Sequence, residues 1–409
     1  MKPFEIDLAE RLAGLREQNL LRELRRVDCA QSPRIQIAEK SFLNFSSNDY
    51  LGLANHPALK EAAVRAVKTF GAGSGASRLI CGSLAPFHEL EIALARLKKT
   101  EAALAFSSGY AAAHGVITAL LDKHDVIILD KLVHACIVDA AKLSGAKIRV
   151  FAHNDVGDLE EKLKWAAQTT GPSQDDRRTL IVTESIFSMD GDAAPLREIA
   201  GLKEKYGAWL MVDEAHATGV FGGKGGGLLE ELGLGDLVEI QMATLGKALG
   251  AAGGCICGSR RLVDFLVNRA RPFIFSTAPV PAAAAAAAEA IRLVQSSEGL
   301  VLRKKLQTNI TTFQAALGSV KPLSFSSSSS VADAATGCRS AIIPIILGDE
   351  QKALAAAAKL RAQSIFVPAI RYPSVARGSA RLRVTLTAAH SHDDIICLVD
   401  ALKKLDIGI

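Results

Sequence analysis

From residue 100 onward, short apolar runs alternate with longer amphipathic segments. The apolar runs have the length of buried strands, and the segments between them have helical spacing. The predicted strands are 102–106, 126–129, 147–151, 179–184, 208–212, 238–242 and 253–257. The predicted helices are 110–121, 134–144, 158–167 and 195–206. This alternation is typical of an α/β fold with a mostly parallel, seven-stranded sheet covered by helices on both faces.

The N-terminal part of the chain has a different pattern. Leucines with helical spacing among charges predict a helix over 5–26. Residues 41–53 begin as a short strand and end in a turn. Amphipathic helices are predicted at 57–70 and 86–99, on either side of the glycine-rich segment 71–83.

A further change of pattern occurs near residue 280. A run of alanines, which favour helix, opens a long amphipathic helix predicted over 282–317. Consecutive serines at 326–330 predict a surface loop. The remaining predicted elements are strands at 341–347 and 381–387 and helices at 350–362 and 391–404. We therefore predict an N-terminal segment at 1–50, a large domain at 51–285 and a small α+β domain at 286–409.

Composition narrows the classes of function. The 409 residues include 48 basic and 43 acidic ones, interspersed, which disfavours nucleic acid and suits small anionic substrates. Seven cysteines and nine histidines show no metal-ligand spacing, so no metal site is predicted. No apolar run reaches the length of a membrane span, and the N-terminus lacks a signal-peptide pattern. We expect a cytoplasmic protein without a membrane partner.

Three residues at the ends of apolar segments carry the most specific chemical signal. Asp213 ends the run 209–212, His216 follows it by three positions, and Lys247 lies between glycines at 244–250. Taken singly, a lysine is usually a surface charge, an acid at a strand end can be a helix cap, and a histidine is more often structural. Together they supply an amine, an acid and a tunable base. That set suits pyridoxal phosphate, which is held covalently through its aldehyde and by its ring nitrogen.

Other segments offer weaker signals. The turn Ser107–Tyr110 joins a strand to a helix and can bind phosphate through backbone N–H groups, or can be an ordinary cap. Thr244 can add a hydroxyl to the same phosphate. His134 can stack on an aromatic ring or cap a helix, and Arg371 can hold a carboxylate or be a surface charge.

Several segments in order resemble the α-oxoamine synthases, a branch of the fold-type I pyridoxal-phosphate transferases. The resemblance covers about 43–390 and includes motifs that the residues above do not explain. The motifs are Leu-Asn-Phe-Ser-Ser-Asn-Asp-Tyr-Leu-Gly-Leu (43–53), Gly-Ala-Gly-Ser-Gly-Ala-Ser-Arg (71–78), Ser-Met-Asp-Gly-Asp (188–192), Asp-Glu-Ala-His (213–216) and Thr-Leu-Gly-Lys (244–247).

The resemblance implies roles for individual residues. Lys247 would carry the cofactor and move protons, Asp213 would pair with the ring nitrogen, His216 would bind the phenolic oxygen, and His134 would stack on the ring. The implied phosphate ligands are Gly109, Tyr110 and Thr244, together with Ser276 and Thr277 from the neighbouring subunit, and Ser188 would lie beside the cofactor. The implied substrate residues are Arg22, Asn48, His134, Arg371 and Ser374, with Arg371 on the amino-acid carboxylate. Ser374 stands where relatives have threonine, and both side chains carry a hydroxyl.

The resemblance also implies a reaction. The chain is most similar to family members that condense L-alanine with a pimeloyl thioester, carried on coenzyme A or an acyl-carrier protein, in biotin biosynthesis. Such an enzyme is an acyltransferase that works as a homodimer with a shared active site. The alternatives are sibling activities: glycine C-acetyltransferase, 5-aminolevulinate synthase and an enzyme joining serine to a long-chain acyl-CoA. A catalytically silent scaffold on the same fold is the alternative from another class.

Overall fold

A central sheet dominates the computed structural model, which describes residues 3–168, 177–317 and 339–405. Within this part of the chain the sheet has seven strands in the order β3-β9-β8-β7-β6-β4-β5. Within this sheet β9 runs in the opposite direction to the other strands. The strands are β3 (Ala102–Phe106), β4 (Val126–Asp130), β5 (Lys147–Phe151), β6 (Thr179–Glu184), β7 (Trp209–Asp213), β8 (Ile240–Thr244) and β9 (Gly254–Gly258). The predicted sheet is confirmed, with strand limits within two residues of those expected.

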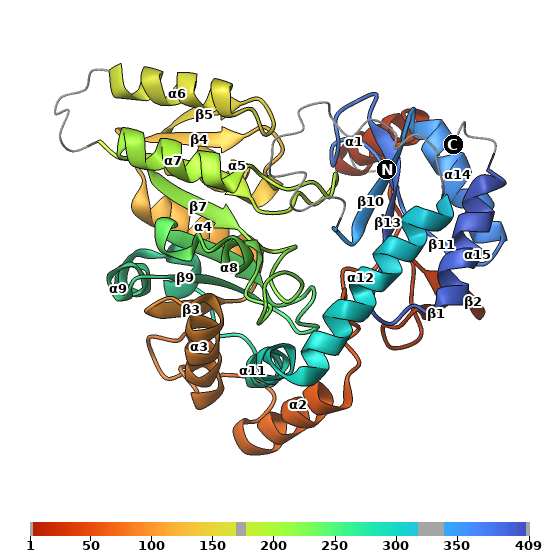
Figure 1. The fold of residues 1–409 in the computed structure, drawn as a ribbon, viewed down its shortest axis with the longest axis horizontal. Coiled ribbons are helices and arrows are strands. Elements are labelled where there is room, and N and C mark those ends of the chain that lie inside the picture. The colour runs from red at the N-terminus through yellow and green to blue at the C-terminus, as the bar shows by residue number, and fades with distance from the viewer. Residues whose placement is uncertain (1–2, 169–176, 318–338, 406–409) are drawn as a thin grey trace.

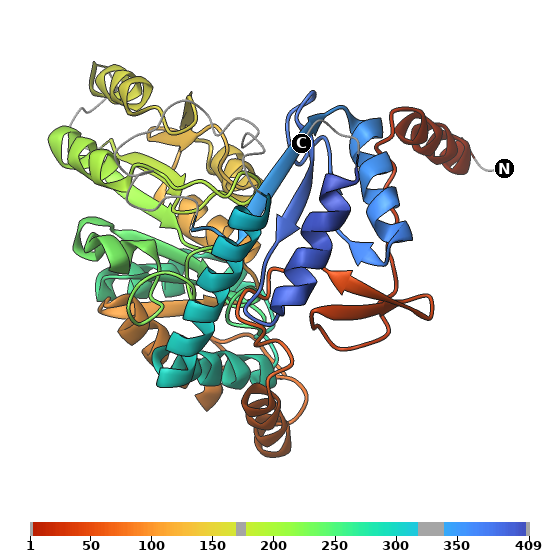
Figure 2. The same cartoon turned by 45° about the vertical axis from the view of Figure 1, so that its right-hand side comes forward.

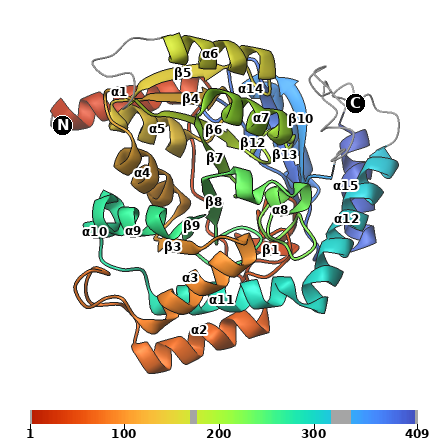
Figure 3. The same cartoon turned by 60° about the vertical axis from the view of Figure 1, so that its left-hand side comes forward.

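Helices cover both faces of this sheet (Figure 1). On one face pack α4 (Gly109–Leu120), α5 (Ala135–Ser144) and α9 (Arg260–Arg269), and on the other α6 (Val156–Gln168), α7 (Leu196–Tyr206) and α8 (Leu228–Leu232). The strands between them are buried on both sides, as the apolar runs predict. Below the β3 edge lie α2 (Pro57–Phe70), α3 (Ala85–Lys98) and α11 (Pro281–Gln295) (Figure 3). The helices predicted at 57–70 and 86–99 are confirmed.

A smaller body stands beside the sheet (Figures 1 and 2). It contains the antiparallel sheet β10-β13-β12, formed by β10 (Ile342–Gly348), β13 (Ala380–Thr385) and β12 (Ala369–Ile370). The helices α14 (Glu350–Ala362) and α15 (His392–Lys403) accompany it. A second small sheet joins β1 (Arg34–Ile37) and β2 (Lys40–Asn44) to β11 (Ile365–Phe366), so the N-terminal segment pairs with the C-terminal part. The short strands β1, β11 and β12 are absent from the sequence prediction. The proposed division at 50 and 285 stays a prediction, and 285 falls within α11.

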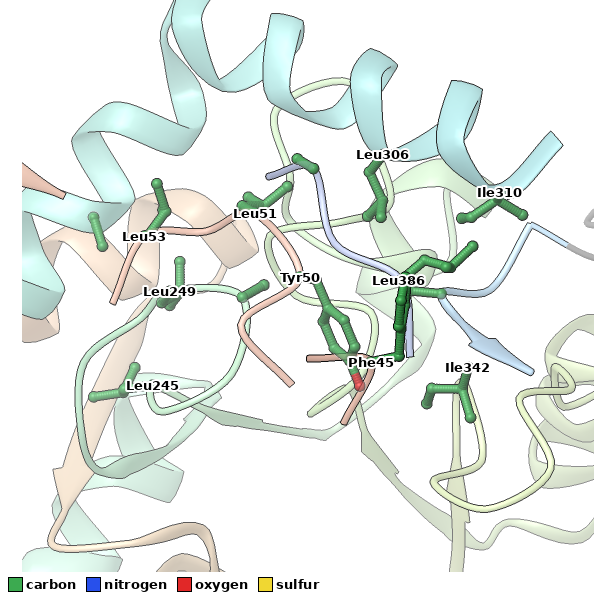
Figure 4. Packing of buried hydrophobic residues seen from close by; sticks show 14 of the residues in the cluster. Phe45, Tyr50, Leu51, Leu53, Leu245, Leu249, Leu306, Ile310, Ile342 and Leu386 are labelled. Atoms are coloured by element: carbon green, nitrogen blue, oxygen red, sulfur yellow. The ribbon is translucent and has the colours of Figure 1, made fainter. Parts of the chain in front are cut away.

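One apolar cluster runs between the two bodies (Figure 4). Phe45 and Tyr50 of the N-terminal segment pack there with Leu306 of α12 (Ser297–Leu317) and Leu386 beyond β13. Each of these side chains is at most 1% exposed. Burying a side chain of this size contributes about 1.5–3 kcal/mol. The cluster therefore fixes the segment 45–53 against the large sheet.

Two predicted helices differ from the structure. The helix expected over 5–26 is α1 (Pro3–Glu17), and Arg22 lies in the irregular segment beyond it. Its leucines continue the apolar pattern, but residue 19 adopts φ +56°, which ends the helix. The helix expected over 282–317 is two helices, because Ser296 has extended backbone between α11 and α12. The Ser296 hydroxyl donates to the Leu293 carbonyl at 2.6 Å and accepts the Gly299 N–H at 3.4 Å, which closes one helix and caps the next. The predicted serine loop 326–330 lies outside the described residues.

Candidate active site

A chain of hydrogen bonds links Lys247, His216 and Tyr50 just beyond the carboxyl ends of β7 and β8. The Lys247 Nζ lies 2.8 Å from His216 Nε2, and the Tyr50 hydroxyl lies 2.5 Å from His216 Nδ1. The Tyr50 hydroxyl also donates to Asn48 Oδ1 at 3.3 Å. A neutral imidazole has one donor and one acceptor nitrogen. A chain running from Lys247 through His216 and Tyr50 to Asn48 therefore gives every group a partner.

Burial sets the charge of this chain. Desolvation, assisted by nearby Lys247 and Arg383, holds the pKa of His216 well below its usual value. Desolvation also lowers the pKa of Lys247, although Asp213 and Glu184 oppose this effect. It raises the pKa of Tyr50 to about 12. The site thus contains an amine with weakened basicity beside a neutral imidazole, which is what a lysine needs to act as nucleophile or base.

Two acids, Asp213 and Glu184, end neighbouring strands and act electrostatically on Lys247. Asp213 ends β7, and the register places Glu184 of β6 opposite it. Both are buried, and Asp213 Oδ1 accepts the Ala215 N–H at 2.9 Å. Desolvation, reinforced by Asp213, raises the pKa of Glu184 well above its usual value. This shift favours the protonated form of Glu184 next to Asp213. The sequence analysis did not identify Glu184 as a site residue, although it is an acid at the end of the predicted strand 179–184.

A buried ion pair between Lys98 and Glu214 fixes the turn that carries His216. Lys98 of α3 donates to Glu214 Oε2 (2.8 Å), Thr218 Oγ1 (2.6 Å) and the Gly226 carbonyl (2.7 Å). Glu214 also accepts the Leu229 N–H through Oε1. Both charged side chains are fully buried, so breaking this pair would leave an uncompensated charge and cost about 3–5 kcal/mol. The pair fixes the turn between Asp213 and His216.

Three of the predicted phosphate ligands lie close together: Gly109 and Tyr110 open α4, and Thr244 at the end of β8 lies against Gly109. A Cβ on Gly109 would come within 2.6 Å of Thr244 Cγ2, so only glycine fits beside that threonine. The Thr244 hydroxyl is buried and has no hydrogen-bond partner among the described residues. Ser108 Oγ accepts the Ala111 N–H at 3.0 Å, while the first N–H groups of a helix have no intrahelical acceptor. An orphaned hydroxyl beside free N–H groups fits a phosphate.

Tyr110 and His134 flank this region. The Tyr110 hydroxyl donates to Asp139 Oδ2 at 2.9 Å, so a phosphate would be held by its backbone rather than its phenol. His134 caps α5, accepting the Cys136 N–H through Nδ1 at 3.2 Å. Desolvation lowers the pKa of His134. The capping interpretation of His134 is confirmed, and its stacking on a cofactor ring stays a prediction.

Arg383 is the main residue that sequence reasoning missed. It lies on β13, is 5% exposed, and donates to the Ser188 carbonyl (2.7 Å), Asn48 Oδ1 (3.1 Å) and Thr385 Oγ1 (2.9 Å). Within the described part of the chain it forms no ion pair. Its positive charge lowers the pKa values of His216 and Lys247. The alternation Arg-Leu-Arg in 381–383 was the available signal, since two arginines on one face of a buried strand require polar partners.

Arg22, Arg371 and Ser374 form a separate cluster. Arg22 Nη2 donates to Ser374 Oγ at 3.2 Å. Arg371 donates to the carbonyls of Asn19 and Leu21, which tie the N-terminal segment to this loop. Desolvation and nearby Arg22 lower the pKa of Arg371. Three of the five predicted substrate residues thus meet one another, while Asn48 accepts a hydrogen bond from Arg383 instead.

Ser276 and Thr277 lie in an exposed stretch after α10 (Arg271–Ile274). Thr277 forms an isolated bridge with Ser77 of the glycine-rich segment. No interaction among the described residues joins either one to Lys247. Their role in a neighbouring subunit stays a prediction.

Known proteins match this chain over nearly its whole length. The sequence model of the class I and II aminotransferases matches residues 40–402. The 8-amino-7-oxononanoate synthase of Geotalea daltonii is 46% identical over 393 residues, covering 96% of each chain. That of Anaeromyxobacter dehalogenans is 48% identical over 379 residues, covering 93% of this chain and 90% of the relative. The chain belongs to the 8-amino-7-oxononanoate synthase family of class I and II aminotransferases.

Solved structures agree with this membership. A serine palmitoyltransferase variant from S. paucimobilis with bound PLP–myriocin superposes with a TM-score of 0.88 at 27% identity, covering 98% of this chain and 96% of that one. The 8-amino-7-oxononanoate synthase of Francisella tularensis gives 0.71 at 28% identity, covering 89% and 96%. The fold is that of the fold-type I pyridoxal-phosphate transferases, as predicted. In the described residues no cluster suited to a metal ion occurs, and no helix there has the length and apolarity to cross a membrane.

Proposed function

We propose that this chain condenses L-alanine with a pimeloyl thioester, on coenzyme A or an acyl-carrier protein, to give 8-amino-7-oxononanoate, carbon dioxide and the free thiol. The observation that carries the proposal is the contact of Lys247 with His216, beside Asp213 and the buried cation Arg383. The identity of 42–48% to family members with that name supports the choice of reaction. We also keep the homodimer and the cytoplasm as predictions.

The residues present fit pyridoxal phosphate. Lys247 would hold it covalently, Asp213 its ring nitrogen, His216 its phenolic oxygen and Thr244 with the start of α4 its phosphate; His134 and Ser188 would lie beside it. When bound, this cofactor supplies an aldehyde for the amine and an electron-withdrawing ring. The orphaned Thr244 hydroxyl and the lowered pKa of Lys247, which desolvation causes, are what such a ligand requires.

Lys247 is the residue that moves protons at the alanine α-carbon. Its pKa is lowered chiefly by burial, so the free amine is available at a lower pH than in solution. The neutral His216 keeps the amine hydrogen-bonded without adding a second positive charge. A carboxylate at the position of Asp213 would stabilise positive charge that develops on the ring nitrogen.

Arg383 is placed to hold the alanine carboxylate. It is buried beside Lys247 and His216, is not ion-paired within the described residues, and shares Asn48 with Tyr50. A guanidinium is a preferred partner of a carboxylate. The Nε and Nη1 of Arg383 already donate to protein acceptors, so Nη2 is the nitrogen left for a ligand among the described residues. Arg371 donates to two backbone carbonyls of the N-terminal segment, and no interaction among the described residues joins it to Lys247 or His216. We therefore assign the carboxylate to Arg383 and the acyl donor to the cluster of Arg22, Arg371 and Ser374.

A second candidate is the condensation of serine with a long-chain acyl-CoA. The higher TM-score to serine palmitoyltransferase favours it, but that enzyme is only 27% identical. Overall shape is shared by the branch, whereas substrate choice depends on individual side chains. The identity to the 8-amino-7-oxononanoate synthases therefore weighs more.

Product identification tests the proposal. The purified holoenzyme is given alanine, serine or glycine with acetyl-, succinyl-, pimeloyl- or palmitoyl-CoA, and the thiol released and the product mass are measured. We expect turnover with alanine and the pimeloyl thioester, and a product lacking one carbon as carbon dioxide. A preference for another pair would reject the proposal in favour of that sibling reaction.

A further inference from the structure

His153 joins two loops that no catalytic assignment connects. It follows β5, and its imidazole lies between two carboxylates: Nδ1 is 2.9 Å from Asp130 Oδ1, and Nε2 is 2.7 Å from Asp192 Oδ2. The neighbouring Asn154 adopts φ +57°, and its Nδ2 donates to Asp192 Oδ2 (2.9 Å) and to the Ala193 carbonyl (3.1 Å). Three segments distant in sequence therefore meet at one imidazole.

The Asp130 side of this contact leads to His134. Asp130 ends β4 and is 1% exposed. Its Oδ1 accepts the Leu132 N–H at 2.8 Å, its Oδ2 accepts the Asn154 N–H at 2.9 Å, and its carbonyl accepts the Val133 N–H. These bonds shape the turn 130–134, whose last residue is the candidate ring-stacking histidine. An imidazole that fixes the Asp130 carboxylate thereby fixes that turn.

The Asp192 side leads to Ser188. Residues 187–192 form a tight turn, closed by hydrogen bonds from the Phe187 N–H to the Asp192 carbonyl (3.0 Å) and from the Gly191 N–H to the Phe187 carbonyl (2.9 Å). The Phe187 ring meets the His153 ring edge-on, with centroids 4.4 Å apart. His153 therefore contacts both ends of the turn that presents Ser188.

The tip of that turn docks on the C-terminal sheet. The Ser188 carbonyl accepts from Arg383 Nε at 2.7 Å, and Asp190 Oδ1 accepts from Arg381 Nη1 at 2.6 Å. Gly191 has φ +74°, and a Cβ there would come within 2.2 Å of the Ile342 carbonyl oxygen. Such close packing leaves the turn little freedom. A shift of the turn would therefore move the Arg383 guanidinium.

The charge of His153 suits this arrangement. Burial lowers its pKa, but the hydrogen bonds to Asp130 and Asp192 outweigh burial and raise the pKa to about 10. A protonated imidazole donates from both nitrogens, whereas a neutral one donates from only one. At neutral pH one cation can therefore donate to both carboxylates, to Asp130 Oδ1 and to Asp192 Oδ2.

We propose that His153 is a positioning residue that sets the spacing between the His134 turn and the Ser188 turn, and through Ser188 the placement of Arg383. The proposal rests on the proposed function for its substrate readout, because Arg383 is assigned there to the alanine carboxylate. His153 touches neither Lys247 nor His216 through any interaction of the described residues. It acts through the loops that present the site.

The test uses the holoenzyme with His153→Gln, Asp192→Asn and the double variant. Glutamine keeps one hydrogen bond but cannot donate to both carboxylates. We expect the KM for alanine to rise about fivefold or more and cofactor affinity to fall, while the KM for pimeloyl-CoA stays within about twofold. The double variant is expected to cost no more than about the worse single variant, since both changes break one contact.

Lys203→Gln is the matched control. Lys203 of α7 forms a half-buried ion pair (2.6 Å) with Glu239, which precedes β8 and so lies at the opposite end of the strand from Thr244. We expect this variant to lower the Tm without changing the KM for alanine. If His153→Gln behaves like the control, with a lower Tm and unchanged KM and cofactor affinity, the residue is only structural and the proposal is overturned.

A pH series supplies a readout that a structural role would not move. The pKa of His153 is raised from 6.5 to about 10 by folding, so its contribution to stability is complete below pH 6.5 and is lost as pH rises through about 10. The charged groups facing it are Asp130 of β4 and Asp192 of the turn. The ratio of alanine KM between His153→Gln and the unmodified enzyme should fall toward one above pH 10. Ionisation of alanine itself cancels in that ratio, so a constant ratio would overturn the proposal.

The test separates this proposal from the proposed function. Turnover of alanine with pimeloyl-CoA by the unmodified enzyme establishes the function independently of His153. Should that turnover be absent, cofactor affinity, measured by absorbance titration, still tests the position of the His134 turn. An affinity unchanged in His153→Gln would then overturn the positioning role.

Discussion

The cluster around Lys247 and the cluster around Arg371 use charge in opposite ways. Lys247, His216 and Tyr50 are packed so that desolvation determines which groups are charged. Arg22 and Ser374 are exposed, and Arg371 is only partly buried and donates to backbone carbonyls of the N-terminal segment. The first arrangement suits proton transfer, and the second suits holding an anionic carrier. Burial, rather than residue type, separates chemistry from recognition in this molecule.

The largest expected effect comes from removing the amine of the buried cluster. Lys247→Ala should fold, retain the cofactor non-covalently at best, and lose about 10²–10⁴-fold or more in kcat, because both attachment and proton transfer depend on the amine. Borohydride reduction followed by mass spectrometry measures covalent attachment. The exposed Lys359→Ala serves as control. Near-normal turnover by Lys247→Ala would show that Lys247 neither attaches the cofactor nor transfers the proton.

The second prediction compares the two arginines directly. Arg383→Gln should raise the KM for alanine about 10–100-fold, since a hydrogen bond to a charged group contributes about 1.5–3 kcal/mol. Arg371→Gln should change it less than about threefold. Steady-state kinetics with alanine varied gives both values. A larger effect at Arg371 would return the carboxylate to the residue that the sequence resemblance implies.

The third prediction concerns the orphaned hydroxyl. Thr244→Val should weaken cofactor binding about 2–10-fold, because one hydrogen bond to phosphate is lost. In the cofactor-free protein the same change should leave the Tm unchanged or higher, since it removes a buried polar atom without a partner. Thr244→Ser should restore affinity. Equal affinity in the valine variant would place the phosphate elsewhere.

The smallest effect is expected in the exposed cluster. Arg22→Ala should raise the KM for the pimeloyl thioester about 2–5-fold at low salt, and by less at high salt, because exposed charges are screened. Arg26→Ala is the matched control, as Arg26 lies on the same segment and pairs with Asp28. A salt-independent effect would argue that Arg22 acts by packing.

The local pattern was sufficient for the large sheet and for the residues that end its strands. Lys247 and His216 are two of the three residues that together suggest the cofactor, and Lys247 Nζ lies 2.8 Å from His216 Nε2. Gly109 and Thr244 also meet, as the phosphate interpretation required. Parallel strands bring their carboxyl ends to one edge, so residues that end such strands converge without further information.

The sequence pattern did not predict contacts between residues that lie far apart in the chain. Tyr50 is next to a predicted turn, but only the fold brings its hydroxyl to His216. In the sequence Arg383 is part of a predicted strand and His153 is an isolated histidine. Their partners come from distant segments and are known only from the fold. The helix predicted through Arg22 ends earlier because residue 19 leaves helical geometry and the following carbonyls bind Arg371.

The sequence by itself determined the sheet, the order of its strands along the chain and the residues presented at their carboxyl ends, because these follow from periodicity and short-range turns. The tertiary structure alone decided which of those residues are charged and which arginine faces the lysine. Those properties depend on desolvation and on partners far away in sequence. Neither is encoded in any single segment.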